Sequence, residues 1–140
     1  MSTVAPQLNS DLHAAREAVL QAFPDIEALY VFGSRARGDA GPQSDLDLAV
    51  LGAAPLDALD RFNAQRELSA QLDVDVDLVD LHAASSVLRS EVVNGGKALY
   101  SRDADRTLDF EARVLGEYAE LLEATRGLRE SVREEGRVYP

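Results

Sequence analysis

Two segments in the first half of the chain have the three-to-four residue spacing of an amphipathic helix. The first begins near Asn9 or Ser10, either of which can cap it, and ends at Pro24. The second runs from Leu56 to Leu72. The predicted apolar stripes of the two helices are Leu12, Ala15, Val19 and Ala22, and Leu59, Phe62, Leu68 and Leu72.

Between and after these helices the pattern changes to short runs that are apolar throughout or alternate with polar residues. Such runs, rich in β-branched and aromatic residues, predict strands. The predicted strands are Ile26–Phe32, Leu46–Leu51, Val74–Leu81 and a short edge strand at Lys97–Tyr100.

The last third of the sequence is helical in pattern. Ser85 or Ser86 can open a short helix that Asn94-Gly95-Gly96 closes, with a glycine in the left-handed cap conformation. Asp103 can cap a long helix that extends to about Glu135. Its wide apolar stripe predicts that the helix packs on its own domain, while a length of about 45 Å leaves the distal half as a candidate docking element. This stripe consists of Val114, Leu115, Tyr118, Leu121, Leu122, Thr125, Leu128 and Val132.

A tight turn follows the first predicted strand, at Gly33-Ser34. Glycine lets the backbone turn sharply and lets a ligand approach, and a helix starting there would direct its free N–H groups at an anion. Ser34 adds a hydroxyl donor, and Arg35 and Arg37 add charged donors suited to phosphate. The segment is not a P-loop, because Asp39 stands where that motif requires lysine.

The second strand begins with Asp45 and Asp47, which lie on one face because side chains two apart on a strand share a face. Two carboxylates so close repel each other unless a cation lies between them. Mg²⁺ is the natural candidate, since it binds one or two carboxylates together with substrate phosphates. A solvated strand edge is the alternative, and it fits Asp45 better than Asp47.

A third acidic run contains Asp73, Asp75 and Asp77 on one face of its strand. If this strand pairs beside the second one, a carboxylate of the run joins the metal site. We expect Asp77, which lies deepest in the apolar stretch, with Asp75 as the alternative. Asp80 has the opposite parity and should face away.

Composition limits the classes of protein. A chain of 140 residues suits a single domain, and the absence of cysteine excludes disulfides and thiol chemistry. A net charge of −11 argues against direct nucleic-acid binding and fits a basic protein partner. There is no membrane-spanning run and no pattern of a signal peptide, so we expect a cytoplasmic protein.

The order Gly33-Ser34, ten residues, Asp45-x-Asp47 resembles the signature of the polymerase-β-like nucleotidyltransferase superfamily. The local sequence is most similar to its minimal members, the MntA-type antitoxins. The resemblance covers about residues 12–100. It implies an α/β (α+β) fold: a small mixed β-sheet flanked by helices, with a long C-terminal helix. It also implies that Asp77 supplies the family's third carboxylate.

The same resemblance implies an activity. Asp45, Asp47 and Asp77 would be the catalytic and metal-binding residues for two Mg²⁺ ions, and Gly33, Ser34 and Arg35 would hold the phosphates of ATP. AMP would be transferred to a tyrosine hydroxyl of a HEPN-type ribonuclease toxin, with which the chain would form a hetero-oligomer. Two alternatives stay open: a small-molecule nucleotidyltransferase of the aminoglycoside-modifying type, and an antitoxin that only binds. The acceptor residue, the number of AMP units and the oligomeric state do not follow from the sequence.

Overall fold

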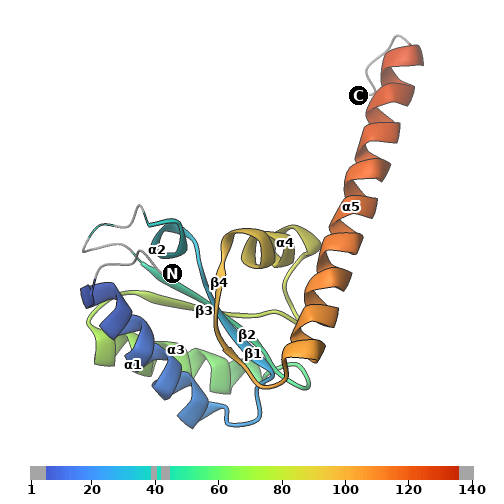
Figure 1. The fold of residues 1–140 in the computed structure, drawn as a ribbon. Coiled ribbons are helices and arrows are strands. Elements are labelled where there is room, and N and C mark those ends of the chain that lie inside the picture. The colour runs from blue at the N-terminus through green and yellow to red at the C-terminus, as the bar shows by residue number, and fades with distance from the viewer. Residues whose placement is uncertain (1–5, 39–40, 42–44, 136–140) are drawn as a thin grey trace.

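A computed structural model of the chain describes residues 6–38, 41 and 45–135. Helices and strands alternate along most of this length (Figure 1). The helices are α1 (Pro6–Ala22), α2 (Ser34–Arg37), α3 (Ala58–Leu72), α4 (Ser86–Gly95) and α5 (Ala104–Glu135). The strands are β1 (Ala28–Phe32), β2 (Leu46–Leu51), β3 (Val76–Asp80) and β4 (Lys97–Ser101).

The four strands form one mixed sheet in the order β3-β2-β1-β4. β1 pairs antiparallel with both β2 and β4, whereas β2 and β3 run parallel and are joined through α3. This arrangement confirms the predicted mixed sheet with β4 at an edge. It also places the end of β1 beside the beginnings of β2 and β3, since Phe32 is opposite Asp47 and Asp47 is opposite Asp77.

The sheet buries both faces, and alternate residues of each strand go to opposite sides. Leu29, Val31 and Leu48 belong to the core that α1 and α3 cover. Tyr30 and Phe32 belong to a second core on the other face, where Val92 of α4 and Phe110 of α5 pack. Figure 1 shows α1 and α3 on one side of the sheet and α4 and α5 on the other.

The predicted caps Ser85 and Asp103 are confirmed, since their side chains accept hydrogen bonds from backbone N–H groups in the first turns of α4 and α5. Asp57, which was not predicted, caps α3 in the same way. The predicted cap of α1 is wrong, because that helix begins at Pro6 and contains Asn9 and Ser10. The predicted left-handed glycine cap of α4 is wrong. Gly96 ends that helix with φ −89° and ψ 177°, an extended conformation that leads directly into β4.

The apolar stripe of α3 is narrower than predicted. Leu68 is buried, but Leu59 and Phe62 are 65% and 47% exposed, because α3 contacts the sheet only through the face that carries Ala64 and Leu68. Arg66 covers part of the exposed Phe62 ring, with its guanidinium carbon 5.8 Å from the ring centroid.

Helix α5 begins on the sheet and then leaves it. Thr107 and Val114 are buried, and the helix packs along α4. Beyond this contact the helix projects away from the rest of the fold (Figure 1). Its exposed large side chains are Leu108, Leu115, Leu121, Leu122 and Leu128. The prediction that the helix packs on its own domain is therefore confirmed for its first half, whereas the described side chains of the second half are uncovered.

Candidate functional site

Two carboxylates meet where β2 and β3 run side by side. Asp47 and Asp77 are direct partners in the parallel register, so both side chains point to the face of the sheet that α4 and α5 cover. Asp45 lies two residues before Asp47 and is exposed. The structure thus brings together the two sequence segments that were expected to supply one acidic site.

Asp80 has the opposite orientation, as its parity predicted. It is 7% exposed, and its two carboxylate oxygens accept hydrogen bonds from the backbone N–H groups of Leu56 and His82, each at 2.9 Å. Asp80 therefore has a structural role at the far end of β3. Asp75 precedes the strand, and Asp73 ends α3 with φ 54°, so neither shares the strand position of Asp77.

The turn at Gly33 is built directly against the acidic pair. Gly33 has φ 73° and ψ −153°, a conformation that is essentially restricted to glycine. A Cβ atom at this position would collide with Oδ2 of Asp47. Ser34 then opens the short helix α2. The absence of a side chain at Gly33 thus lets the backbone of the turn approach the carboxylate closely.

The charges around Asp47 disfavour its ionised form. Burial raises the pKa of this carboxyl above its ordinary value of 3.8, and the neighbouring charges of Asp77, Asp45 and Glu91 raise it further. Arg37 acts in the opposite direction and lowers it. A site that strains a carboxylate in this way is suited to a divalent cation, which would relieve the repulsion.

The turn at Gly33-Ser34, Asp45 and Asp47 line one cavity of about 530 Å³, and Asp77 is not part of its lining. One of its residues, Glu91, was not anticipated from the sequence. Arg37, which was expected beside Arg35 as a donor to phosphate, does line the cavity. Glu91 carries no sequence signal, because only the packing of α4 on the sheet brings it to the site. The lining consists of Phe32, Gly33, Ser34, Arg37, Asp45, Asp47 and Glu91.

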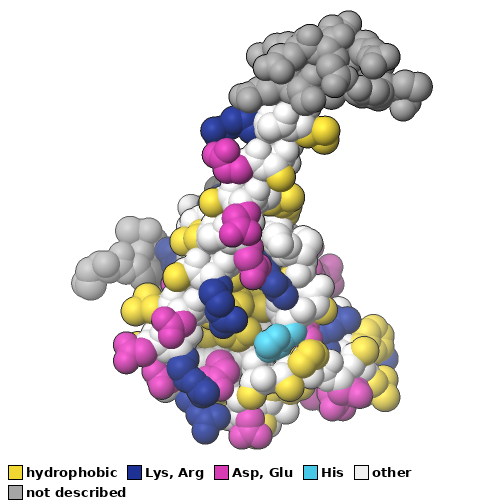
Figure 2. All heavy atoms as spheres, turned by 90° about the vertical axis from the view of Figure 1, so that its right-hand side faces the viewer, with side chains coloured by type: hydrophobic (Ala, Val, Ile, Leu, Met, Phe, Trp, Pro, Cys, Tyr) yellow, Lys and Arg dark blue, Asp and Glu magenta, His cyan; other side chains and the backbone are white. Residues whose placement is uncertain are grey.

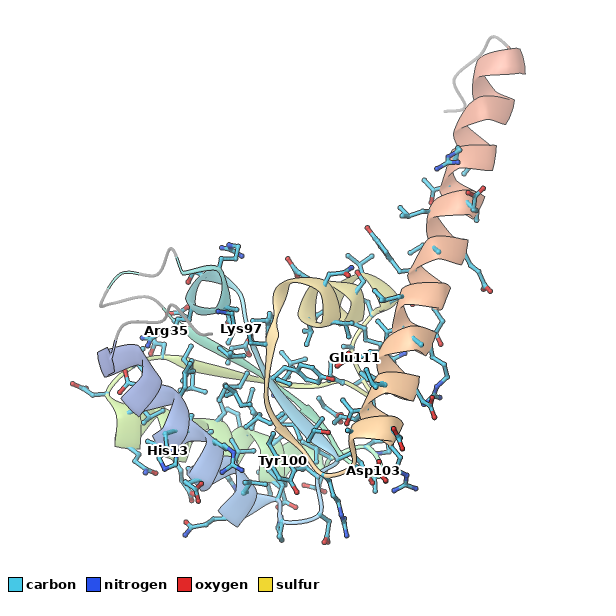
Figure 3. The ribbon with its side chains drawn as sticks, in the orientation of Figure 1. His13, Arg35, Lys97, Tyr100, Asp103 and Glu111 are labelled. Carbon is cyan, nitrogen blue, oxygen red and sulfur yellow. The ribbon has the colours of Figure 1, made fainter. Side chains whose placement is uncertain are left out.

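Arg35 is placed elsewhere. It is 3% exposed and its guanidinium lies 3.5 Å from the carboxylate of Asp11 on α1, so it does not line the cavity. Figure 3 shows Arg35 between α2 and the beginning of α1. Two arginines of the same short helix thus face in different directions: Arg35 faces α1 and Arg37 faces the acidic site.

A second cavity, of about 460 Å³, adjoins the first and shares Gly33, Arg37 and Glu91 with it. We name it the α4–α5 groove. Its other lining residues come from α4 and α5: Val87, Ser90, Asn94, Gly95 and Tyr118. The two cavities together form a continuous path from the acidic pair to α5.

No three His, Asp or Glu side chains converge into a ready-made metal cage anywhere in the described ranges of the chain. The acidic site offers instead an opposed pair, Asp47 and Asp77, with Asp45 nearby. That arrangement fits Mg²⁺, which takes one or two protein carboxylates and completes its octahedron with water and phosphate oxygens.

A further cavity of about 320 Å³ lies at the opposite end of the sheet, at the foot of α5. Figure 2 shows basic side chains and a histidine around this hollow. Arg89 and Arg106 are held there by the carboxylates of Glu117 and Glu27, at 3.7 and 3.3 Å. This cavity contains none of the acidic residues of the β2–β3 site.

Three comparisons with known proteins agree with this geometry. Residues 17–105 match the family described as polymerase beta, nucleotidyltransferase. The protein adenylyltransferase MntA of Shewanella oneidensis is 41% identical over 98 residues, which is 70% of each chain.

Among the described residues, none of the helices has the length and the apolar character that a membrane span requires.

Solved structures are similar over more of the chain. A crystal structure of a toxin–antitoxin pair with AMP-PNP has a TM-score of 0.77 and 34% identity, covering 87% of this chain and 98% of the other. A structure of the tri-AMPylated HEPN toxin of Shewanella oneidensis with its MNT antitoxin has a TM-score of 0.74 and 31% identity, covering 90% of this chain and 98% of the other.

Proposed function

Because this chain belongs to the polymerase-β nucleotidyltransferase family, and within it to the MntA protein adenylyltransferases, we propose that it transfers AMP from ATP to a HEPN-type ribonuclease toxin. The acceptor is a tyrosine hydroxyl, and the transfer silences the toxin. The observation that carries the proposal is the close approach of Gly33 to Asp47, which is paired with Asp77, since it joins a turn suited to phosphate to paired carboxylates.

Gly33 and Ser34 hold the β- and γ-phosphates. The N–H groups at the start of α2 donate to phosphate oxygens, and the Ser34 hydroxyl adds another donor. Arg37 replaces Arg35 in the role that we expected for the latter, because its side chain lines the cavity. The guanidinium offsets negative charge that would otherwise accumulate between the carboxylates and the phosphates.

Asp45, Asp47 and Asp77 are the residues that would hold Mg²⁺ at the α-phosphate. When bound, the ion neutralises phosphate charge and lowers the barrier to displacement at phosphorus. Asp77 has one of two roles: it completes the ligand set, or it takes the proton of the acceptor hydroxyl. The rest of the site acts by positioning and by electrostatic stabilisation.

The reaction forms a bond between the acceptor oxygen and the α-phosphorus and breaks the bond from that phosphorus to the bridging oxygen of the β-phosphate. Pyrophosphate leaves with the bonding electron pair. The hydroxyl proton goes to a base or to solvent. The turn at Gly33-Ser34 holds the leaving phosphates, so the acceptor approaches from the opposite, open side of the cavity.

The distal half of α5 is the proposed docking surface for the toxin. Its exposed leucines alternate with charged residues along the projecting helix, as Figure 2 shows for hydrophobic and acidic side chains. Exposed apolar patches of this kind mark contact sites between proteins. The two solved pairs with which this chain is similar are both antitoxins bound to toxins.

The test is to co-express the chain with a HEPN-type ribonuclease toxin and to measure the mass of the intact toxin by mass spectrometry. The toxin should gain mass in multiples of one AMP unit, and cells should grow. The double variant Asp45→Ala/Asp47→Ala should leave the toxin unmodified and should not protect, even if it still binds. Removing two carboxylates that repel each other should not unfold the domain.

The matched control is Asp60→Ala, an acidic residue of α3 outside the cavity. It should protect as well as the wild type. A double carboxylate variant that protects fully at normal expression would overturn the enzymatic proposal and favour an antitoxin that only binds. Transfer to a small molecule with no transfer to the toxin would favour the aminoglycoside-type alternative.

A further inference from the structure

The cavity at the foot of α5 lies away from the acidic site and has no part in the chemistry proposed above. It shares no lining residue with the acidic cavity or with the α4–α5 groove. Its volume is about 320 Å³. A cavity of about 150 Å³ already takes up one benzene molecule, so this one has room for an aromatic or branched group together with a small polar group.

The walls of this cavity are held in place by hydrogen bonds. Arg89 of α4 donates from Nε to the carbonyl of Leu81 at 2.7 Å and from Nη2 to the carbonyl of His82 at 3.0 Å. Nε2 of His82 in turn donates to the carbonyl of Gly52 at 2.7 Å. These bonds tie the start of α4 to the loops that follow β2 and β3. The cavity is therefore formed before a ligand arrives, as most ligand sites are.

The charges around the cavity do not cancel. Arg89 faces the carboxylate of Glu117 at 3.7 Å, and Arg106 faces that of Glu27 at 3.3 Å. Arg113 also lines the cavity, and it makes no hydrogen bond or ion pair with any residue that the structure describes. Three arginines and two glutamates leave one excess positive charge here, in a chain whose net charge is −11. A local excess of positive charge attracts anions.

The lining between the charged groups is apolar. Leu51, Leu81, Phe110 and Val114 contribute to it, and Figure 2 shows hydrophobic side chains inside the hollow with basic side chains around them. A fully hydrated anion such as phosphate gains nothing from this surface, whereas an anion with an apolar group can bury that group against it. A carboxylate suits Arg113, because the planar guanidinium can donate two parallel hydrogen bonds to it.

We propose that the cavity at the foot of α5 is a binding site for a carboxylate that carries a compact apolar group. Arg113 pairs with the carboxylate, and the apolar lining around Phe110 covers the rest of the ligand. Two sources have this chemistry: a free organic acid, and the C-terminal residue of a partner chain. The inference is independent of nucleotide transfer, since the site shares no residue with the acidic cavity.

The first experiment titrates the ¹⁵N-labelled full chain with three probes and follows its backbone amide signals by NMR. The probes are 3-phenylpropanoate, the uncharged 3-phenylpropanamide, and acetate. 3-Phenylpropanoate should bind at least tenfold more tightly than the other two, because the amide lacks the charge and acetate lacks the apolar group. The signals that shift should be those of Gly52, Phe110 and Arg113, while those of Gly33 and Asp47 stay in place. Inorganic phosphate should bind no more tightly than acetate.

The second experiment repeats the titration with variants. Arg113→Gln should weaken 3-phenylpropanoate binding at least tenfold, to the level of the uncharged amide, and Arg113→Lys should keep part of the affinity because the charge remains. Arg126→Gln, on the same helix but outside the cavity, is the matched control and should change nothing. Glu117→Gln should strengthen binding several-fold, because it removes a carboxylate one turn from Arg113. A variant that has lost its fold cannot produce this gain.

A longer ligand distinguishes the two sources. The acetylated tripeptide alanyl-alanyl-phenylalanine ends in the same carboxylate and ring as 3-phenylpropanoate. Tighter binding of the tripeptide would support the C-terminus of a partner chain as the occupant. Weaker binding of the tripeptide would support a free organic acid.

Several results would overturn the inference. No shift at millimolar 3-phenylpropanoate, or equal affinity for the acid and its amide, would exclude a carboxylate site. Phosphate that binds as tightly as 3-phenylpropanoate would remove the role of the apolar lining. Shifts centred on Gly33 and Asp47, or equal losses in Arg113→Gln and Arg126→Gln, would place the anion elsewhere on the protein.

Discussion

The phenol of Tyr30, in the middle of β1, donates a 2.7 Å hydrogen bond to Oε2 of Glu111 on α5. Burial, together with this bond and the nearby carboxylate charge, raises the pKa of Tyr30 well above its ordinary value. The bond joins residues 81 positions apart in the sequence. It fixes α5 on the sheet two turns before Tyr118, so it helps to set one wall of the α4–α5 groove.

Tyr30→Phe should therefore lower the free energy of unfolding by about 1–3 kcal/mol, since it leaves a partly buried carboxylate without its donor. Glu111→Gln should cost less, because the amide oxygen can still accept the bond. Urea denaturation measures both values. As a control, Glu123→Gln on the exposed part of α5 should change the free energy by less than about 0.5 kcal/mol. Equal stability of Tyr30→Phe and the wild type would show that the bond does not hold α5.

Gly33→Ala and Gly38→Ala differ both in backbone strain and in collision. Both glycines have positive φ, 73° and 82°. Gly38 is left-handed, where an alanine stores about 1–2 kcal/mol of strain, whereas the ψ of −153° at Gly33 belongs to a region that is essentially restricted to glycine. A Cβ at Gly38 meets no atom within 4 Å, whereas one at Gly33 collides with Asp47. Gly33→Ala should be the less stable of the two and should lose AMP transfer, while Gly38→Ala should retain transfer. Thermal melts and pyrophosphate release measure the difference, and comparable activity in the two variants would contradict the close approach at Gly33.

Asp47→Asn should stabilise the protein in the absence of metal. The folded state raises the pKa of this carboxyl above 3.8, so the folded state binds its proton to a higher pH than the unfolded chain does. Ionisation above the raised pKa thus costs stability in the wild type, and the asparagine avoids this cost.

The gain in Tm from Asp47→Asn should be largest at neutral pH and should disappear as the pH falls toward 3.8. Added Mg²⁺ should raise the Tm of the wild type more than that of the variant. AMP transfer should be lost at every pH. A variant that is less stable than the wild type at pH 7 without metal would refute the repulsion between Asp47 and its acidic neighbours.

Asp77→Asn and Asp80→Asn differ in what they remove. Asp77 faces Asp47 across the parallel strands, and its loss should reduce the rate of AMP transfer at least a hundredfold with little change in stability. Asp80 accepts two backbone hydrogen bonds, so an asparagine there should cost about 1–3 kcal/mol of stability and leave the rate per folded molecule unchanged. If Asp80→Asn lowered the rate of AMP transfer and Asp77→Asn did not, the wrong carboxylate of β3 would have been assigned to the acidic site.

Ending the chain after Leu121 tests the projecting half of α5. The domain should keep its fold and its ATP affinity, because the leucines beyond this point are exposed. Toxin binding should weaken at least tenfold if Leu122 and Leu128 form the interface. Leu122→Ala/Leu128→Ala in the full chain is the matched variant and should also weaken toxin binding. Val132 of the predicted stripe lies outside the residues whose side chains are described. If neither the shortened chain nor the double leucine variant changed toxin affinity, the docking surface would lie elsewhere.

Local pattern in the sequence determined most of the elements and the core of the candidate site. The alternation in β2 and β3 placed Asp45, Asp47 and Asp77 on a common face, and the turn at Gly33 followed from a glycine after an apolar strand. These features depend on residues that are close in the chain, where the strand period of two fixes the direction of each side chain. The same rule correctly separated Asp80 from the acidic pair.

What only the tertiary structure decided concerns residues whose neighbours are distant in sequence. Arg35 and Arg37 are two positions apart, but packing of α1 holds the first beside Asp11 while the second faces the carboxylates. Glu91 reaches the site because α4 folds back over the sheet, and the exposed Leu59 and Phe62 show that an apolar helix face need not find a partner. The physical reason is that periodicity fixes which side of an element is apolar, whereas long-range packing decides which element covers that side and which polar groups are brought together.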